Sequence, residues 1–267
     1  MIDLRKGVEI AGFVLGERIG SGGMGQVWVA TEGELGRKIA LKLIRTDIGD
    51  TEEMRQRFIL EARTSAAIEH PNVVPIYRVG QEEDILFIAM RLVDGPSLAD
   101  VLNKEVFLEP QRAVSIVCQV ASALDAAHEI GFVHRDVKPA NILLASYATG
   151  EHAYLADFGL ARFIAQSGLS RSGQSIGTPS YMSPEQVRGE KTVDGRADIY
   201  ALGCVLFQTL TGDVPYPREE THAIYFAHLE AEPPCCSERN SSVDPAFDEV
   251  VARALAKSPG DRYASPD

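Results

Sequence analysis

The segment VHRDVKPANILL, residues 133–144, carries three side chains whose types suit phosphoryl transfer. Asp136 supplies a carboxylate, Lys138 an ammonium and Asn141 a carboxamide. A second carboxylate, Asp157, lies in the segment LADFGLA, residues 155–161, which is expected to follow a strand. Phosphoryl transfer needs a base for the proton of the acceptor hydroxyl, and cations that neutralise the charge on the moving group. If the two segments converge, they supply the base and a place for a metal ion.

A glycine-rich stretch near the N-terminus, IGSGGMGQVWVA, has the pattern G-x-G-x-x-G at positions 20, 22 and 25. Two phosphate-binding loops share this pattern: one begins a helix and holds a dinucleotide, and the other folds back as a hairpin over ATP. The residues after Gly25 alternate and are β-branched, and Lys42 occupies the region in which a dinucleotide site needs an acidic residue. The sequence therefore favours the hairpin.

Lys42 lies in the run IALKLI, residues 39–44, where both faces of a strand would be apolar. Strand alternation places Ala40, Lys42 and Ile44 on one face. Lys42 could be an ordinary solvated lysine, but an ammonium among apolar neighbours needs a carboxylate or phosphate partner. Glu61, in the middle of the following helical segment, is the natural carboxylate.

The elements that must position these residues change in character along the chain. Strands are expected over residues 13–20, 26–32, 37–44, 73–80 and 84–93, and a helix over 50–70 with Asp50 as its N-cap. After Asp94, helices are expected over residues 111–131, 194–212 and 245–259. The second of these is apolar on nearly all sides, which predicts a buried helix. We therefore predict an α+β fold with a strand-rich part, residues 1–93, followed by a helix-rich part, residues 94–267.

The whole-chain properties narrow the class of protein. The 267 residues carry a formal net charge of −12 at pH 7, and such an acidic surface argues against binding of nucleic acid. The four cysteines lack zinc-site spacing and indicate a reducing compartment. Cys118 and Cys204 lie in apolar helical runs and are expected in the core, whereas Cys235 and Cys236 follow two prolines and are expected at the surface.

The sequence shows neither a signal peptide nor an apolar run long enough to span a bilayer, so no membrane contact is expected for this chain. The final residues, from Ser265 to Asp267, have the composition of a helix start. We therefore expect the chain to be a truncated piece of a longer protein, whose C-terminal region could hold a membrane anchor.

The ordered set of motifs resembles the eukaryotic-like (Hanks-type) protein kinases. The wording GSGGMG, HRDVKPANILL and GTPSYMSPEQ is most similar to the actinobacterial, PknB-like group of Ser/Thr kinases, over residues 12–262. The resemblance implies the bilobal protein kinase fold, with a five-stranded sheet and one main helix in the first lobe and a mostly helical second lobe. It implies a cytoplasmic domain that transfers the γ-phosphoryl group of ATP to Ser or Thr hydroxyls of proteins, with Mg²⁺, or alternatively Mn²⁺, as the metal.

The same resemblance implies catalytic roles. Lys42, paired with Glu61, would hold the α- and β-phosphates. Asp136 would orient the substrate hydroxyl and accept its proton, and Lys138 would contact the γ-phosphate. The remaining ligands would be Asn141 and Asp157 for the metal, and Ile19, Gly20, Gly22, Gly25, Val27, Ala40, Met90, Val93 and Leu143 for the nucleotide.

Regulation follows from the resemblance as well. Arg135 would receive a phosphate from the activation loop, where Ser170 and Ser172 stand at the positions of paired phosphothreonines in related kinases. Serines are also common in flexible loops, which is the plainer interpretation of these two. Thr178 would bridge toward the catalytic residues, and autophosphorylation would proceed within a homodimer. A buried ion pair is expected from two further residues, Glu185 and Arg262.

Two alternative functions fit the sequence less well. A pseudokinase scaffold would have lost one of Lys42, Asp136, Asn141 or Asp157, and all four are present. A small-molecule kinase such as an aminoglycoside phosphotransferase lacks the GTPSY and SPE segments that this chain has. The sequence therefore favours an active Ser/Thr protein kinase.

Overall fold

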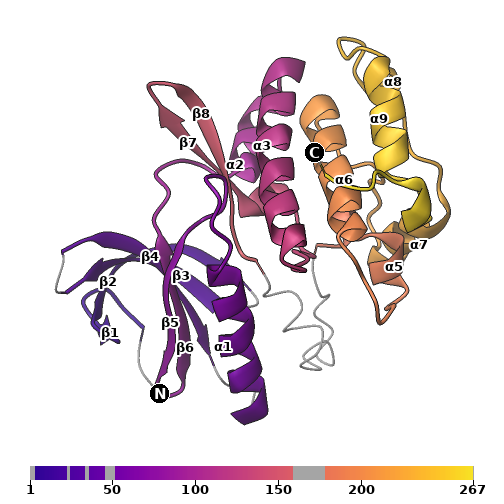
Figure 1. Ribbon diagram of the computed structural model, residues 1–267. Helices are drawn as coiled ribbons and strands as arrows, with labels where there is room; N and C mark the ends of the chain where they lie inside the picture. Colours follow the sequence, from indigo (N-terminus) through magenta and orange to yellow (C-terminus); the bar gives the residue numbers. More distant parts are fainter. Residues whose placement is uncertain (1–3, 23–24, 34–35, 46–51, 159–177, 267) are drawn as a thin grey trace. The chain divides into compact units, whose positions relative to one another are not determined.

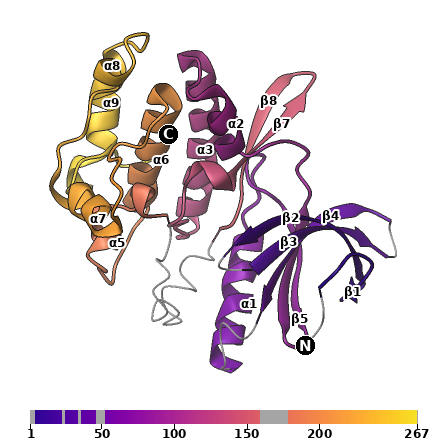
Figure 2. The ribbon, with the colours of Figure 1, turned by 180° about the vertical axis from the view of Figure 1, so that it is seen from behind.

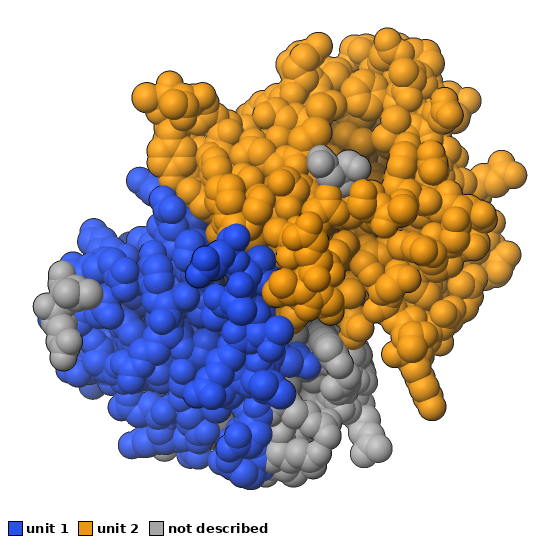
Figure 3. All heavy atoms as spheres, viewed as in Figure 1, with its two compact units in different colours: residues 1–69, 74–94, 162–174 blue, residues 70–73, 95–161, 175–267 orange. Residues whose placement is uncertain are grey.

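The computed structural model describes residues 4–22, 25–33, 36–45, 52–158 and 178–266. These residues form two compact units, which Figure 3 colours separately. The first unit holds the described residues up to 69 and from 74 to 94, and the second holds 70–73 and the described residues from 95 onward. The first is built on a sheet and the second is mostly helical, so the α+β class is confirmed.

One antiparallel sheet forms the first unit, with the strand order β1-β2-β3-β4-β6-β5 (Figure 1). The strands are β1 (Glu9–Ile10), β2 (Phe13–Gly22), β3 (Gly25–Glu32), β4 (Lys38–Arg45), β5 (Ile76–Glu82) and β6 (Ile85–Arg91). The expected five strands are present, and β1 adds a sixth. Its two residues pair with the start of β2 and are too few to show an alternating pattern. The strand β5 begins three residues later than predicted, and β6 ends two residues sooner. Val73, expected in β5, instead makes a bridge to Leu155.

The two faces of this sheet have different roles. Trp28, Leu41 and Phe87 belong to a buried apolar cluster on one face. The register pairs Val27 with Lys42, one position along from the pair of Trp28 and Leu41. Because successive residues of a strand point to opposite faces, Val27 and Lys42 lie on the face away from this cluster.

The helix of the first unit, α1 (Glu52–Ala66), packs against β5, and Figures 1 and 2 both show the two side by side. It ends before the predicted position 70, because the amides of Ala67 and Ile68 already bond to carbonyls three residues earlier. Phe58, Ala62 and Ser65 form its buried face. The expected N-cap, Asp50, lies outside the described residues.

The second unit is organised around α6 (Arg196–Thr211), which packs against α3 (Pro110–Glu129) and α9 (Ala246–Ala254) (Figure 2). Nearly every residue of α6 is buried, as its apolar sequence predicts. The other elements are α2 (Leu98–Glu105), α5 (Pro184–Val187), α7 (Thr221–Glu230), α8 (Cys236–Arg239), the hairpin β7 (Ile142–Tyr147) and β8 (Gly150–Leu155), and the short 3₁₀ helices η2 (Pro139–Asn141), η4 (Pro179–Tyr181) and η5 (Pro259–Asp261).

Two glycines are required by close approaches of the main chain. Gly25 has a φ of 143°, and a Cβ atom there would overlap the carbonyl oxygen of Leu43 on β4. A Cβ atom on Gly95 would overlap the carbonyl oxygen of Leu144 on β7. The chain beside Gly95 also bonds to β7, because Leu144 N donates to Pro96 O at 2.9 Å. No other residue type fits either place without moving a strand.

Two cysteine predictions were wrong. Cys118 is exposed, because the buried stripe of α3 runs through Ala113, Ile116 and Val120 and leaves it outside. Cys236 is completely buried, because the short helix α8 packs against α6 and α9. Cys204 is buried as predicted. None of the helices in the described part of the chain combines the length and the apolar character needed to cross a membrane.

Candidate active site

The structure brings two predicted catalytic residues and one predicted metal ligand into direct contact on one loop of the second unit. Lys138 Nζ donates to Asp136 Oδ2 at 2.7 Å. Asn141, in the 3₁₀ turn η2, donates through Nδ2 to Asp136 O at 2.8 Å and to Asp136 Oδ2 at 3.1 Å. The carboxylate of Asp136 is therefore fixed by a cation and an amide, and its other oxygen, Oδ1, makes neither of these bonds.

A residue that sequence reasoning missed holds this loop. Asp198, fully buried in the first turn of α6, accepts through Oδ1 from Arg135 N at 2.7 Å. Its Oδ2 accepts from His134 N and from His128 Nε2, both at 2.8 Å. Charge-assisted bonds to main-chain amides are strong and directional. The position of this loop is therefore fixed by α6. In the sequence, the one acidic residue within a nearly apolar helix was the feature that could have indicated the role of Asp198.

Arg135 stands at the centre of these contacts. Its φ is 66°, a left-handed conformation that costs a non-glycine residue energy and that is enriched at functional sites. Its carbonyl accepts from Gln186 Nε2 at 2.9 Å, and its Nη2 donates to Val193 O at 3.2 Å. Arg135 is expected to bind a phosphate carried by Ser170 or Ser172. Both serines lie outside the described residues.

The second predicted metal ligand, Asp157, follows β8 and also has a left-handed φ, 65°. The residue before it, Ala156, makes two hydrogen bonds to residues 133–141, which we call the catalytic loop. Its amide donates to Asn141 O at 2.9 Å, and its carbonyl accepts from His134 Nε2 at 2.9 Å. The ring of Phe158 then packs on His134, with centroids 4.5 Å apart. The segments that carry Asn141 and Asp157 are therefore hydrogen-bonded neighbours.

The donor set suits a hard divalent cation. Asn141 and Asp157 offer oxygen atoms, the ligands that Mg²⁺ prefers when it keeps water and phosphate oxygens in the rest of its shell. Within the described ranges, no three His, Cys, Asp or Glu side chains cluster as a complete metal site would require.

The predicted nucleotide residues of the first unit lie mainly on one face of the sheet. Val27 pairs with Lys42, and Ala40 pairs with Met90, across β3, β4 and β6. Lys42 is only 5% exposed. The remaining positions are Gly20 opposite Val27, Gly22 opposite Gly25, Ile19 exposed on β2, Val93 half-buried after β6, and Glu61 half-buried on α1.

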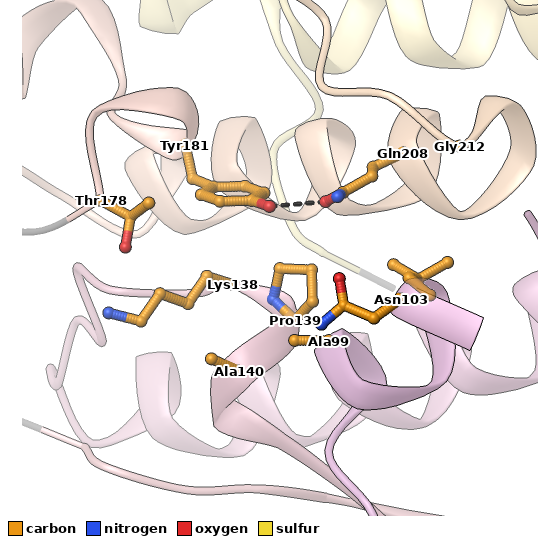
Figure 4. A pocket seen from close by; sticks show the side chains of 10 residues that line it. Ala99, Asn103, Lys138, Pro139, Ala140, Thr178, Tyr181, Gln208 and Gly212 are labelled. Atoms are coloured by element: carbon orange, nitrogen blue, oxygen red, sulfur yellow. Dashed lines mark hydrogen bonds between the residues drawn. The ribbon is translucent and has the colours of Figure 1, made fainter. Parts of the chain in front are cut away.

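Leu143 and Thr178 belong to the second unit. Leu143 is half-buried on β7, where it makes a bridge to Ser97 just before α2. Thr178 precedes the 3₁₀ turn η4 and lines a pocket together with Lys138 (Figure 4). The close-up shows the hydroxyl oxygen of Thr178 on the side of the wall that Lys138 forms.

The expected ion pair of Glu185 and Arg262 is confirmed. Arg262 Nη1 donates to Glu185 Oε1 at 2.7 Å and Nη2 to Oε2 at 2.8 Å. Burial alone would raise the pKa of Glu185, but the bonds and the charge of Arg262 hold that pKa below its usual value. Arg262 also donates to the carbonyls of Arg196 and Ala256, both at 2.8 Å, so the pair joins α5 to α6 and to the C-terminal segment.

These features occur in the order that defines one family of phosphotransferases. The family described as the protein kinase domain matches residues 13–267, and the chain belongs to this family. Members of the family use ATP and a divalent metal ion. A solved structure of the PknI kinase domain from Mycobacterium tuberculosis superposes with a TM-score of 0.79 at 32% identity, and the match covers 99% of this chain and 95% of that one. The expected kinase fold is therefore confirmed.

The sequence relatives are bacterial. Serine/threonine-protein kinase PknJ of Mycobacterium tuberculosis is 40% identical over 266 residues, which is 98% of this chain and 45% of PknJ. PknD of the same species is 42% identical over 260 residues, and PknB of Mycolicibacterium smegmatis is 39% identical over 257. The match covers 39% of that PknD and 40% of that PknB, so the chain spans less than half the length of these curated relatives. The expected likeness to the PknB-like group is confirmed.

Proposed function

We propose that this chain is a catalytic domain that transfers the γ-phosphoryl group of ATP to Ser and Thr hydroxyls of proteins. The observation that carries the proposal is the contact of Lys138 and Asn141 with the carboxylate of Asp136. In this proposal a base, a cation and a metal-ligating amide lie together on one loop. The relatives named above, all serine/threonine-protein kinases, support the choice of acceptor.

Asp136 acts as the base. Its free oxygen takes the proton of the acceptor hydroxyl while the acceptor oxygen forms a bond to the γ-phosphorus and the bond from that phosphorus to ADP breaks. Lys138 keeps the carboxylate in one orientation and presents positive charge beside the transferring group. When bound, Mg²⁺ neutralises phosphate charge, and Asn141 and Asp157 would be the residues that hold it.

The first unit supplies the nucleotide contacts in this proposal. Lys42 binds the α- and β-phosphates and takes Glu61 of α1 as its carboxylate partner. Gly20, Gly22 and Gly25 would let main-chain amides cover the phosphates, and Met90 would line the inner end of the adenine site. The adenine ring would contact Ile19, Val27, Ala40, Val93 and Leu143. We also assign residues 1–93 and 94–267 to the two lobes of the domain.

Regulation is the finer part of the proposal. Arg135 would bind a phosphate placed on Ser170 or Ser172 by a second copy of the chain. The left-handed main chain at Arg135, and its bonds to α5 and α6, would let such a phosphate act directly on the loop that carries Asp136. Alanine at both serines should lower turnover, whereas unchanged turnover of that double variant would exclude this mode of activation.

The test is transfer of labelled phosphate from ATP to the chain itself and to a generic basic protein. Asp136→Asn should lower the rate by about 10²–10⁴-fold, the usual contribution of a general base. Asp213→Asn is the matched control, because Asp213 is an exposed aspartate at the end of α6. Transfer should require Mg²⁺ or Mn²⁺ and label Ser or Thr. Full activity of Asp136→Asn, or label on tyrosine alone, would refute the proposal.

A further inference from the structure

Gln186 lies at the third position of the short helix α5 (Figure 1). Its Oε1 accepts from Ser183 N at 3.1 Å and from Ser183 Oγ at 3.0 Å, at the start of the same helix. Its Nε2 donates to Arg135 O at 2.9 Å. One half-buried amide group therefore accepts on one side and donates on the other, and it joins α5 to a residue 51 positions earlier in the catalytic loop.

The residue type at position 186 is explained by the bond to the catalytic loop. At the third position of a helix, either Glu or Gln can accept from the amide of the residue that caps the helix. A Glu at this position would offer Ser183 the same acceptor. A carboxylate has no hydrogen to donate, however, and its second oxygen would face the carbonyl oxygen of Arg135. The start of α5 accepts both residue types, whereas the bond to Arg135 requires the amide.

The carbonyl that accepts from Gln186 belongs to the peptide group between Arg135 and Asp136. The N–H of this same group, on Asp136, donates to His134 Nδ1 at 3.2 Å. A peptide group is planar, so bonds to both its oxygen and its nitrogen prevent the plane from rotating. The orientation of the plane sets ψ of Arg135 and φ of Asp136. It therefore sets the direction in which the side chain of Asp136 leaves the main chain.

The strained main chain at Arg135 depends on such bonds. A left-handed φ of 66° at a residue other than glycine persists only where the surrounding structure holds it. Asp198 fixes the peptide group before Arg135, because its Oδ1 accepts from Arg135 N at 2.7 Å. Gln186 holds the peptide group after it. Loss of the bond from Gln186 should therefore let this second group turn toward a less strained orientation.

A turn of this peptide group would displace the proposed base. The carboxylate of Asp136 is now within 2.7 Å of Lys138 Nζ and 3.1 Å of Asn141 Nδ2. A displacement of about 1 Å at a reacting group can lower a rate by about 10²-fold. The bonds of Gln186 reach Ser183 and a main-chain carbonyl rather than a reacting group. Its loss should therefore slow transfer and leave the binding of ATP and protein unchanged.

We propose that Gln186 is a positioning residue for the transfer of the phosphoryl group. Through the peptide group between Arg135 and Asp136, it holds the carboxylate of Asp136 in the orientation that accepts the proton of the acceptor hydroxyl. This inference rests on the proposed kinase function and adds to it a residue from outside the catalytic loop. It also gives α5 a part in the reaction that is separate from its part in the ion pair of Glu185 and Arg262.

Two variants remove the donor at position 186. Gln186→Glu keeps an acceptor for Ser183, and Gln186→Met keeps the length of the side chain without either polar atom. Single-turnover transfer of labelled phosphate measures the chemical step, and steady-state kinetics give KM for ATP and for a generic basic protein. Each variant should transfer phosphate about 10–10²-fold more slowly than the wild type. Both KM values should change by less than about twofold, as expected for an interaction that acts only on the transition state.

Two further variants separate positioning from stability and from charge. Ser183→Ala removes the hydroxyl that donates to Gln186 but keeps the bond from Gln186 to Arg135. It should lower the thermal unfolding temperature and slow transfer by less than about threefold. Gln111→Glu makes the same chemical change as Gln186→Glu on the exposed side of α3 and should alter neither property. Thermal unfolding shows which variants are folded, and either folded variant of Gln186 suffices for the test.

The outcomes separate this inference from the proposed function. Wild-type rates of single-turnover transfer in a folded variant of Gln186 overturn the positioning role alone. Rates that follow the unfolding temperature across all the variants, Ser183→Ala included, show a merely structural role and overturn it as well. A rise in KM that accounts for the whole loss, or an equal loss in Gln111→Glu, does the same. Absence of transfer by the wild type, to the chain itself and to proteins, refutes the kinase function.

Discussion

Arg262 and Glu185 are joined by two parallel hydrogen bonds of 2.7 and 2.8 Å, and both side chains are almost completely buried. Two charges out of water are tolerated only because each satisfies the other and because further carbonyls accept from the guanidinium. The pair joins residues 77 positions apart in the sequence, so it acts as a clamp on the second unit.

Arg262→Ala should therefore destabilise the domain by about 3–5 kcal/mol, because it leaves a buried carboxylate without its partner. Arg188→Ala is the matched control. Arg188 forms an exposed pair with Glu190 at 3.6 Å, and its loss should cost less than about 1 kcal/mol. Urea unfolding monitored by circular dichroism measures both. Equal losses for the two variants would contradict the assignment of the clamp.

The clamp should also weaken in acid. The pKa of Glu185 in the folded chain lies below its usual value of 4.5, despite burial, because of Arg262. A lowered folded pKa means that the stabilisation is complete above the unfolded pKa and is lost as the pH falls through the folded one. The stability difference between the wild type and Glu185→Gln should therefore shrink below pH 4.5. A constant difference down to acid unfolding would be the contrary result.

His228 should make stability depend on pH in a higher range. Burial, and then the charge of Lys257, lower its pKa from 6.5 to about 4, while Tyr200 shares a 2.8 Å hydrogen bond with its Nδ1. The unfolded chain binds the proton more readily, so stability is complete above pH 6.5 and falls between 6.5 and about 4. The loss should reach about 3 kcal/mol.

Urea unfolding at several pH values between about 7.5 and 4.5 tests this slope. His228→Asn should flatten the curve, and it offers Tyr200 an oxygen in place of Nδ1. His222→Asn is the control, because His222 is exposed on the same helix. The explanation fails if both variants keep the slope of the wild type.

Asp198→Asn should disable the catalytic loop. An amide has one accepting oxygen, so its NH₂ group would face one of the donors now bound to Asp198, from His128, His134 or Arg135. The unpaired buried group should cost about 1–3 kcal/mol of folding free energy. Phosphate transfer should fall much further than in the control Asp213→Asn. Wild-type turnover in Asp198→Asn would show that the loop does not depend on α6.

The thiols should react in a fixed order with a reagent such as dithionitrobenzoate. Cys118 is exposed and should react first, whereas Cys204 and Cys236 are buried and should react only on unfolding. Burial and the nearby carboxylate of Asp248 raise the pKa of Cys236 to about 12, which further lowers its reactivity. Half-buried Cys235 should react more slowly than Cys118, so Cys118→Ser should remove the fastest phase. A fast phase that survives in this variant would place an exposed thiol elsewhere.

Much of the fold follows from local sequence patterns. Alternation predicted β2, β3, β4 and β6, and helical spacing predicted α3, α6 and α9. Each of these elements shows the spacing of apolar residues that is typical of its type. A strand before Asp157 was expected, but its pairing with β7 in a hairpin was missed, because the pairing depends on a partner strand that the local pattern does not reveal. The helix α2 was also missed, although its N-cap Ser97 and its partner Asp100 form a capping box that the sequence displays.

The sequence likewise predicts the local features of the candidate site but not its long-range contacts. The residue types of the catalytic loop indicate their chemistry directly, and their mutual contacts follow from short spacing. Asp198 could not be paired with His134, because they are 64 residues apart and meet only after α6 is packed. The hydrogen bond between Tyr181 and Gln208 also joins distant parts of the sequence, so local patterns could not predict it. Cys118 was misplaced because an apolar helical run does not reveal which face the core will cover.

The contact of Gly95 with the carbonyl of Leu144 bears on drug resistance. Leu144 adjoins Leu143, which would contact the adenine ring in the proposed function, and the main chain at Gly95 leaves no room for any side chain. A mutation at position 95 that reshaped this floor would disturb β7 and hinder folding before it altered inhibitor affinity. Inhibitors that contact this edge of the proposed nucleotide site would therefore meet a surface that a substitution at position 95 cannot change without impairing folding.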